Sequence, residues 1–287
     1  MVSGKWPVIG ILGGAGPDAA IDIQFKISKF IKQRLHITRD QEHFGVIVNN
    51  DCQIPDRSTA INENDRNILD IYIKRALQLE HMGANVLIIA CNTAHAFLND
   101  IQNFISIKVL NMIEETARYC LHTYSGVKKI GVISTLGAHK SKIYSRVFAD
   151  YNLEVISGDE DYLNKAHQAI YAIKAGFKMN PDCNMAEGDQ IKLLNLIYRN
   201  SGLNEKFIDI NNTPKDLIIE ALNNIRYKDV HHTILGCTEL PLAIGQCDYH
   251  QQVLIDPNAI VANSAIDYCI SELARSEVRF NSILEPL

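Results

Sequence analysis

The sequence carries one pattern twice, and this repeat restricts the possible folds more than any other feature. An apolar segment running into a glycine-containing turn begins at Val8 and again at Lys129. Each copy is followed by an apolar run that ends in a cysteine, Cys91 in the first and Cys237 in the second, and the second interval is 25 residues longer. An asparagine-rich, turn-prone stretch around residues 177–214 accounts for the difference as an insertion.

The pattern within each copy predicts an α/β fold. Short apolar runs bounded by glycine and asparagine alternate with amphipathic segments, which is typical of a parallel β-sheet flanked by helices. We predict strands at 7–12, 45–50, 85–90, 129–134, 153–156 and 232–235, and helices at 17–34, 64–82, 93–101, 141–151, 163–175, 214–225 and 259–273.

The repeat further predicts two pseudo-symmetric domains. The first comprises residues 1–113 plus 257–287 and carries Cys91; the second comprises residues 114–256 and carries Cys237 and the insertion. Ligands of open α/β sheets gather at the carboxyl ends of the strands, where both cysteines are expected. We therefore expect the active site in the cleft between the domains.

Composition excludes several classes of function. A chain of 287 residues with 47% hydrophobic residues can bury a large core, and a formal net charge of −5 offers no basic surface for nucleic acid. No apolar run reaches the roughly 18 residues that would span a membrane, and none near Met1 resembles a signal peptide. We expect a cytoplasmic protein that binds neither nucleic acid nor membrane.

The number and spacing of the cysteines favour free thiols over disulfide bonds or a zinc site. Seven cysteines, an odd number with no CxxC spacing, argue against a disulfide framework and a zinc ribbon. His231 and His232 with Cys237 do not form a convincing ligand set, so we expect no metal. A thiol at a helix N-terminus is favoured as the reactive thiolate, and two such thiols facing one site would be a matched base and acid.

Six motifs, in order, carry a family resemblance. They are Gly13-Gly-Ala-Gly-Pro17, Asn49-Asn-Asp-Cys-Gln-Ile-Pro-Asp-Arg57, Cys91-Asn-Thr-Ala-His95, Leu110-Asn-Met-Ile-Glu-Glu-Thr116, Ile170-Tyr-Ala-Ile-Lys-Ala-Gly176 and Gly236-Cys-Thr-Glu-Leu-Pro-Leu242. Together they resemble the aspartate/glutamate racemase family, in its aspartate racemase branch. The resemblance implies a PLP-independent enzyme that needs no cofactor, acts on an acidic amino acid and commonly forms homodimers.

The resemblance also implies roles for individual residues. It makes Cys91 and Cys237 the catalytic pair, and Arg57 and Lys174 the groups that hold substrate carboxylates. Two loops would line the cleft, and they add Gly14, Ala15 and Thr135 as substrate contacts. The residue types suggest that the side chains of Asn92, Thr93 and Thr238 stabilise the charge that builds on the substrate carboxylate, and that His95 and Glu239 tune the two thiols unequally.

Departures from the family pattern leave the substrate open. Ala15 and Ala138 stand where relatives commonly have Met and Thr, so glutamate or a broader range of amino acids remains an alternative to aspartate. Glu239, where glutamate racemases usually have His, favours aspartate.

Two other classes of function remain open from the residues. Gly14-Ala-Gly16-Pro-Asp-Ala19 fits a loose dinucleotide fingerprint, which would suit an NAD-dependent oxidoreductase, but Asp51 lies too far along the chain for the ribose-binding acid. A non-catalytic ligand-binding protein of the same fold is the other alternative.

Overall fold

The computed structural model divides the chain into two compact units, and each is described by itself. It describes residues 6–176, 196–197, 212–226, 228–244, 249 and 252–275. Unit 1 comprises residues 1–55, 66–116 and 258–287, and unit 2 comprises 56–65 and 117–257. Most of the predicted insertion at 177–214 lies outside the described residues.

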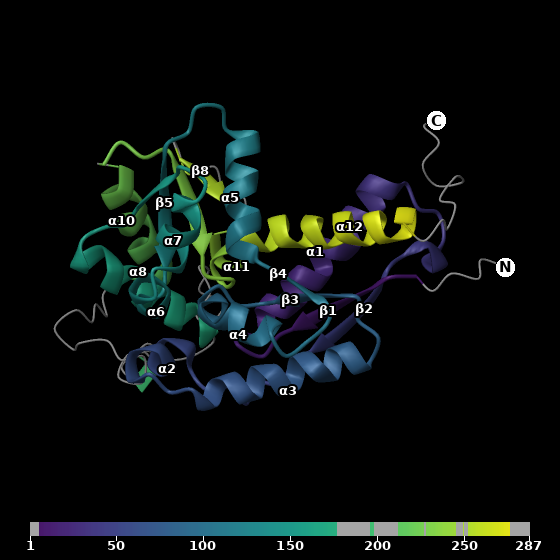
Figure 1. The fold of residues 1–287 in the computed structure, drawn as a ribbon. Helices are drawn as coiled ribbons and strands as arrows, with labels where there is room; N and C mark the ends of the chain where they lie inside the picture. Colours follow the sequence, from purple (N-terminus) through teal and green to yellow (C-terminus); the bar gives the residue numbers. More distant parts are fainter. Residues whose placement is uncertain are drawn as a thin grey trace. The chain divides into compact units, whose positions relative to one another are not determined.

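Each unit contains a four-stranded parallel sheet with helices around it, as the sequence predicts (Figure 1). The strands of unit 1 are β1 (Val8–Leu12), β2 (Gly45–Asn49), β3 (Val86–Ile89) and β4 (Lys108–Leu110), in the order β2-β1-β3-β4. Those of unit 2 are β5 (Lys129–Ser134), β6 (Glu154–Ile156), β7 (His232–Gly236) and β8 (Val253–Ile255), in the order β6-β5-β7-β8. The orders match strand for strand, so the repeat in the sequence is also a repeat in the fold.

The helices of each unit connect its strands. In unit 1 these are α1 (Pro17–Leu35), α3 (Asn67–His81), α4 (Leu98–Gln102) and α12 (Pro257–Arg275), with short 3-10 helices η1 (Asp40–Glu42) and η2 (Thr93–Phe97). Unit 2 contains α2 (Arg57–Glu63), α6 (Leu136–Lys140), α7 (Ile143–Ala149), α8 (Glu160–Lys174), α10 (Pro214–Arg226) and α11 (Leu240–Ile244). Helix α5 (Met112–Thr123) contains the boundary between the units.

Helices cover both faces of the sheet in unit 1, because successive side chains of its strands point to opposite faces and both faces are buried. Ile9 and Ile11 of β1, with Val86 and Ile88 of β3, belong to a core that also contains the buried faces of α1 and α12. Helix α3 lies on the opposite face of the sheet (Figure 1). Burial of both faces explains why the strands are continuous apolar runs.

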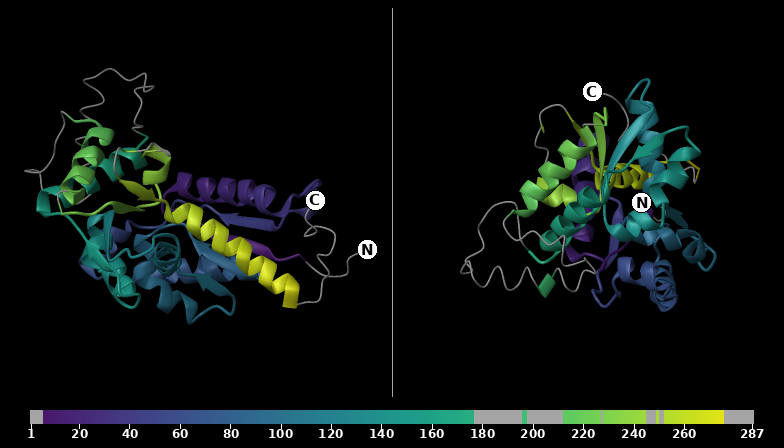
Figure 2. Two further views of the ribbon diagram at one scale, coloured as in Figure 1. Left: turned by 90° about the horizontal axis from the view of Figure 1, so that it is seen from above. Right: turned by 90° about the vertical axis from the view of Figure 1, so that its left-hand side faces the viewer.

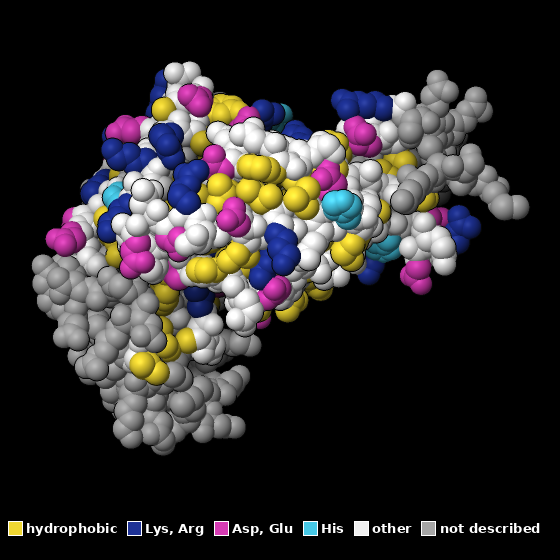
Figure 3. All heavy atoms as spheres, turned by 60° about the horizontal axis from the view of Figure 1, so that its bottom comes forward, with side chains coloured by type: hydrophobic (Ala, Val, Ile, Leu, Met, Phe, Trp, Pro, Cys, Tyr) yellow, Lys and Arg dark blue, Asp and Glu magenta, His cyan; other side chains and the backbone are white. Residues whose placement is uncertain are grey.

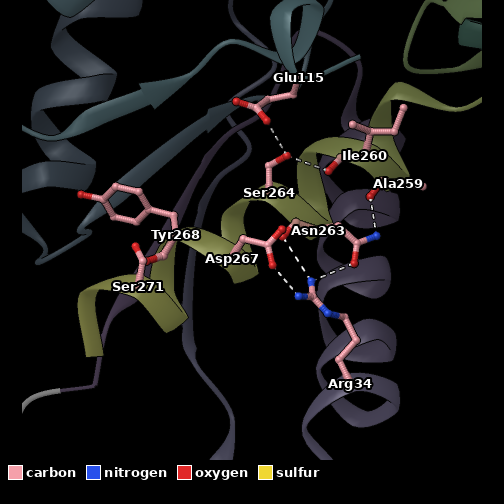
Figure 4. Close-up of polar contacts among 9 residues, drawn as sticks. All are labelled: Arg34, Glu115, Ala259, Ile260, Asn263, Ser264, Asp267, Tyr268 and Ser271. Atoms are coloured by element: carbon pink, nitrogen blue, oxygen red, sulfur yellow. Dashed lines mark hydrogen bonds and ion pairs between the residues drawn. The ribbon is translucent and has the colours of Figure 1, made fainter. Parts of the chain in front are cut away.

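Polar contacts fasten the last helix of the described chain to unit 1. Arg34 of α1 forms an ion pair with Asp267 and donates to the side-chain oxygen of Asn263 at 3.1 Å, both on α12 (Figure 4). Ser264 donates to the Glu115 carboxylate of α5 at 2.9 Å. Figure 2 shows α12, in yellow, lying along the strands of this unit. A segment distant in sequence thus completes the core of the first sheet.

Unit 2 buries its sheet mainly against α8 and α10. Ile133 of β5 and Leu235 of β7 share one core with Ile170 of α8 and Leu222 of α10. Asp159 caps α8 by accepting from the backbone N–H of Tyr162 at 2.9 Å. The cap fixes where this helix starts and therefore which residues its last turn presents.

Several predicted elements differ from the observed ones. The predicted helix over 64–82 is α3, which begins only at Asn67, because Asn64 adopts a left-handed conformation and ends the separate helix α2. The predicted helix over 93–101 is the 3-10 helix η2 followed by α4, and 141–151 is shortened to α7 after α6. The three-residue strands β4 and β8 were not predicted, because their apolar patterns are too short to stand out.

The surface carries charges of both signs. On the face displayed in Figure 3, basic, acidic and hydrophobic side chains are interspersed. Within the described residues, no helix is both long and apolar enough to cross a bilayer.

Candidate functional site

The first predicted cysteine lies at the carboxyl end of the sheet of unit 1. Cys91 comes two residues after β3, where its backbone N–H donates to the carbonyl of Ile89 at 2.8 Å, and the residue is only 6% exposed. The neighbouring strand β1 pairs Leu12 with Ile89. The glycine loop that follows β1, with Gly14 and Ala15, therefore leaves the sheet beside the turn that holds Cys91.

The backbone of the glycine loop has a fixed shape. Gly14 has a φ of +82°, and its N–H donates to the side-chain oxygen of Asn50 at 2.8 Å. A Cβ at this position would lie 2.0 Å from the carbonyl oxygen of Asp51, so only glycine fits. Arg75 holds Asp51 through both the backbone carbonyl and the carboxylate. The buried Ala15 is thus presented by a rigid turn.

His95 supports the Cys91 turn through the backbone. Its Nδ1 lies 2.9 Å from the carbonyl oxygen of Cys91, and its Nε2 accepts the backbone N–H of Met112 at 3.1 Å. An acceptor at Nε2 requires the neutral tautomer with the hydrogen on Nδ1. Burial also lowers the pKa of His95, which keeps the ring neutral. Asn92 and Thr93, on the same turn, are buried as well.

The second predicted cysteine has a carboxylate on its sulfur. Cys237 directly follows β7 in unit 2, and its Sγ donates to Oε2 of Glu239 at 2.9 Å. The hydroxyl of Thr238 donates to the same oxygen at 3.1 Å, and the Lys174 ammonium lies 3.2 Å from Oε1. The Glu239 side chain is 4% exposed, whereas Lys174 is 20% exposed. Three predicted site residues therefore converge on Glu239.

The pKa of Cys237 is raised in this cluster, whereas the sequence predicts a thiol that favours the thiolate. Burial raises the pKa of Cys237, and the Glu239 carboxylate raises it further, although the charge of Lys174 acts the other way. The expected lowering by a helix N-terminus is wrong for Cys237, because the helix that follows, α11, has only five residues and begins three residues later. Cys237 is thus held as a protonated thiol.

Glu239 is charged in this cluster although it is buried. Burial raises the pKa of Glu239, but the positive charge of Lys174, the hydrogen bonds from Cys237 and Lys174 and the charge of Arg57 outweigh it, and the pKa is lowered overall. A buried carboxylate needs such compensation. Arg57 and Lys174 therefore act on the same carboxylate that binds the Cys237 thiol.

Arg57 is the first residue of helix α2. Asp56 caps α2 by accepting from the backbone N–H of Thr59 at 2.8 Å, which starts the helix at Arg57. Tyr171 of α8 donates to the other Asp56 oxygen at 2.6 Å. These contacts lie within unit 2, to which residues 56–65 belong.

Thr135 lies beside Cys237 in the sheet of unit 2. The strands β5 and β7 pair Ser134 with Gly236, so the residue after each strand leaves the sheet at the same edge. The hydroxyl oxygen of Thr135 accepts the backbone N–H of Ala138 at 3.2 Å and caps α6. The loop with Thr135 thus occupies, beside Cys237, the place that the glycine loop occupies beside Cys91.

The arrangement in unit 2 can hold anions and transfer a proton. A buried thiol, a carboxylate that accepts its hydrogen and two cations are the parts needed to bind a carboxylate and exchange a proton at a neighbouring carbon. In the part of the chain that the structure describes, no group of three or more His, Cys, Asp or Glu could hold a metal ion.

Sequence reasoning missed two residues of this region, Asp56 and Tyr171. Asp56 follows Pro55 and precedes a short helix, which is a signal for a helix N-cap. Tyr171 lies three residues before Lys174, so both fall on the same face of α8. The spacing identifies the face, but it does not identify the partner, which lies 115 residues away in the sequence.

Comparisons with known proteins agree with this geometry. The model of the Asp/Glu/Hydantoin racemase family matches residues 12–182. The broad specificity amino-acid racemase RacX of Bacillus subtilis is 29% identical over 170 residues, which cover 58% of this chain and 71% of RacX. Glutamate racemase 3 of Caldanaerobacter subterraneus is 24% identical over 187 residues, 65% of this chain and 54% of that enzyme. The structure of aspartate racemase from Picrophilus torridus superposes with a TM-score of 0.63 at 25% identity, covering 92% of this chain and 94% of that one.

Proposed function

The chain belongs to the Asp/Glu/Hydantoin racemase family, and we propose that it racemises an acidic amino acid, preferably aspartate, without a cofactor. Cys91 and Cys237 are the proton-transfer groups, and both act on one bound substrate. The observation that carries the proposal is their equivalence: each follows the third strand along the chain in its unit, at the carboxyl end of sheets with the same strand order. Two equivalent thiols suit a reaction that must work from both faces of a carbon.

The chemistry needs two groups because the product is the mirror image of the substrate. One thiolate removes the α-hydrogen as a proton, and the electron pair stays on the α-carbon and its carboxylate. The opposite thiol then delivers its own proton to the other face, and the two cysteines exchange roles in the reverse direction. General acid–base steps of this type contribute about 10²- to 10⁴-fold each to a rate.

The two cations of unit 2 support an acidic substrate. Lys174 is already paired with a carboxylate, that of Glu239, and Arg57 is close enough to lower the pKa of the same group. A guanidinium and an ammonium together match a molecule with two carboxylates, and their positive charge offsets the charge that develops at the α-carbon. The partial exposure of Lys174 lets it reach a ligand while Glu239 stays buried.

The preference for aspartate rests on the resemblance of the motifs and on the likeness to the aspartate racemase structure. A broader specificity is the second candidate, because RacX is among the relatives and because the side chains are small at Ala15 in the glycine loop and at Ala138 in α6. Glutamate racemases are also among the relatives.

A substrate panel tests the proposal. The purified protein is incubated separately with L-aspartate, L-glutamate, L-alanine and L-lysine, and D-amino acid is measured by chiral chromatography. We expect D-aspartate with a kcat/KM about tenfold or more above that for glutamate, since one methylene is worth roughly 1–3 kcal/mol in a fitted site. Comparable rates on alanine or lysine would establish the broader specificity. Absence of every D-amino acid would refute the racemase proposal.

A further inference from the structure

Helix α2 is held from two sides by other helices of unit 2. From α8, Tyr171 donates to Oδ2 of Asp56 at 2.6 Å, while Oδ1 of the same carboxylate caps α2. From α6, Gly137 approaches α2 so closely that a Cβ added to it would lie 2.6 Å from the Cα of Ser58. The first turn of α2, which contains Arg57, is therefore fixed both through a side-chain hydrogen bond and through backbone packing.

The Tyr171 side chain is itself held in place. Its ring contacts the ring of His167, one turn earlier on α8, at a centroid distance of 4.5 Å. His167 is fully buried, and its Nδ1 accepts the backbone N–H of Leu136 at 3.1 Å where α6 begins. The tyrosine is thus connected to both α2 and α6, and it has little freedom to leave Asp56.

The hydrogen bond between Tyr171 and Asp56 is charge-assisted. Burial raises the pKa of Asp56, but the hydrogen bonds from Tyr171 and Thr59 and the charge of Arg57 lower it more, so the carboxylate remains ionised. Burial and the charge of Asp56 raise the pKa of Tyr171, so the phenol keeps its proton. A phenol that donates to a carboxylate forms a stronger bond than a neutral pair.

We propose that Tyr171 is a positioning residue that orients Arg57 for the substrate carboxylate by binding Asp56. This inference rests on the proposed function of Arg57 and extends it. Tyr171 touches Asp56, and Arg57 is the next residue along the chain, so the tyrosine acts through the first turn of α2. Because Lys174 is three residues further along α8, the same contact sets the place of the guanidinium relative to the ammonium. Hydrogen bonds from charged groups to a carboxylate depend on their geometry, so displacing this pair weakens substrate binding.

The variant Tyr171→Phe removes only the hydroxyl and tests the proposal. We expect KM for aspartate to rise about tenfold, the effect of one lost charge-assisted hydrogen bond, while kcat changes much less. A second readout needs no substrate: modification of Arg57 by phenylglyoxal, followed by mass spectrometry, should become faster because Arg57, 7% exposed, is no longer held. The matched control is Tyr151→Phe, which removes a hydroxyl that accepts from Arg118 at 3.0 Å and leaves α2 untouched.

Unchanged KM and unchanged Arg57 modification in Tyr171→Phe would overturn the proposal. If the wild-type protein does not racemise aspartate, the proposed function fails, and the modification rate alone still decides whether Tyr171 orients Arg57. Should Tyr171→Phe unfold, Asp56→Asn takes its place, because asparagine still caps a helix but weakens the bond to the phenol. We expect this variant to change KM and Arg57 modification in the same direction but less, and no change in either would overturn the proposal.

Discussion

Cys91 and Cys237 occupy equivalent places in two sheets of identical order, but their surroundings differ. Beside Cys91, the neighbouring His95 binds the backbone: it contacts the carbonyl of Cys91 and the N–H of Met112. Beside Cys237, the neighbouring Glu239 binds the sulfur itself and gathers Lys174. The two sheets thus place a thiol at the same position, and the residues next to each cysteine determine which groups contact it.

The difference shows how one repeat can supply two unlike groups. The neutral His95 contacts the backbone of the turn and not the sulfur of Cys91. Glu239, in contrast, accepts a hydrogen bond from the sulfur of Cys237 and keeps that thiol protonated. A racemase needs one thiolate and one thiol at the start of each turnover. We infer that Cys237 is the proton donor in the resting protein, and the predictions below for Glu239 and Lys174 test this asymmetry.

The largest effect is expected from the cysteines. We expect Cys91→Ser and Cys237→Ser each to lower the kcat of racemisation by about 10³-fold, because each removes one of the two groups that we propose for proton transfer. The matched control is Cys52→Ser at an exposed cysteine, which should retain the wild-type rate. Chiral chromatography measures all three. A doubly substituted Cys91→Ser, Cys237→Ser protein that racemises at the wild-type rate would break the account.

A smaller effect is expected at Glu239. In Glu239→Gln the negative charge and the charged acceptor that raise the pKa of Cys237 are both lost, so this pKa falls and more thiolate is present at pH 7. We expect alkylation of Cys237 by iodoacetamide to accelerate and its pH profile to shift towards lower pH. Site-resolved mass spectrometry follows each cysteine separately.

The substitution Lys174→Met tests the same control of the Cys237 pKa, because it should raise this pKa whereas Glu239→Gln should lower it. The charge of Lys174 lowers the pKa of Cys237, so its removal should slow alkylation of this thiol. Neither variant should alter alkylation of Cys91. Equal profiles for Cys237 in the wild type and in Glu239→Gln would show that the carboxylate does not control the thiol.

The last prediction concerns His95 and the stability of the fold. Because burial lowers the pKa of His95 in the folded protein, the unfolded chain binds more protons as the pH falls below about 6.5, and the wild type loses stability there. We expect His95→Asn to cost about 1–3 kcal/mol at pH 8 through lost hydrogen bonds, and less at pH 5.5. Urea unfolding at both pH values measures this, and a cost that grows towards acid pH would contradict it.

The fold could largely be predicted from the sequence, because buried parallel strands are continuous apolar runs and helices carry an apolar stripe. Val8–Leu12 and Lys129–Ser134 are the central strands of the two sheets. The errors arose where a few polar contacts decide the structure. Asp56 starts a helix that was not predicted, and the left-handed Asn64 ends it.

The candidate site was less accessible to prediction. The places of Cys91 and Cys237 after buried strands could be predicted because both residues end apolar runs, and the closeness of Glu239 to Cys237 because the two are two residues apart. The contact between Tyr171 and Asp56 could not, since no local pattern encodes a hydrogen bond across 115 residues. The rise in the pKa of Cys237 was also missed, because it depends on burial and on where the Glu239 carboxylate lies.

Racemisation of L-aspartate in deuterated water tests most directly whether two separate thiols carry the proton. The D-aspartate formed first is isolated by chiral chromatography and its α-position is analysed by mass spectrometry, together with that of the remaining L-aspartate. We expect deuterium in the D-aspartate and hydrogen in the unreacted L-aspartate, since one group takes the hydrogen and another, exchanged with solvent, supplies the deuteron. D-aspartate that retains its original α-hydrogen would contradict the account, because a single group would then have moved it.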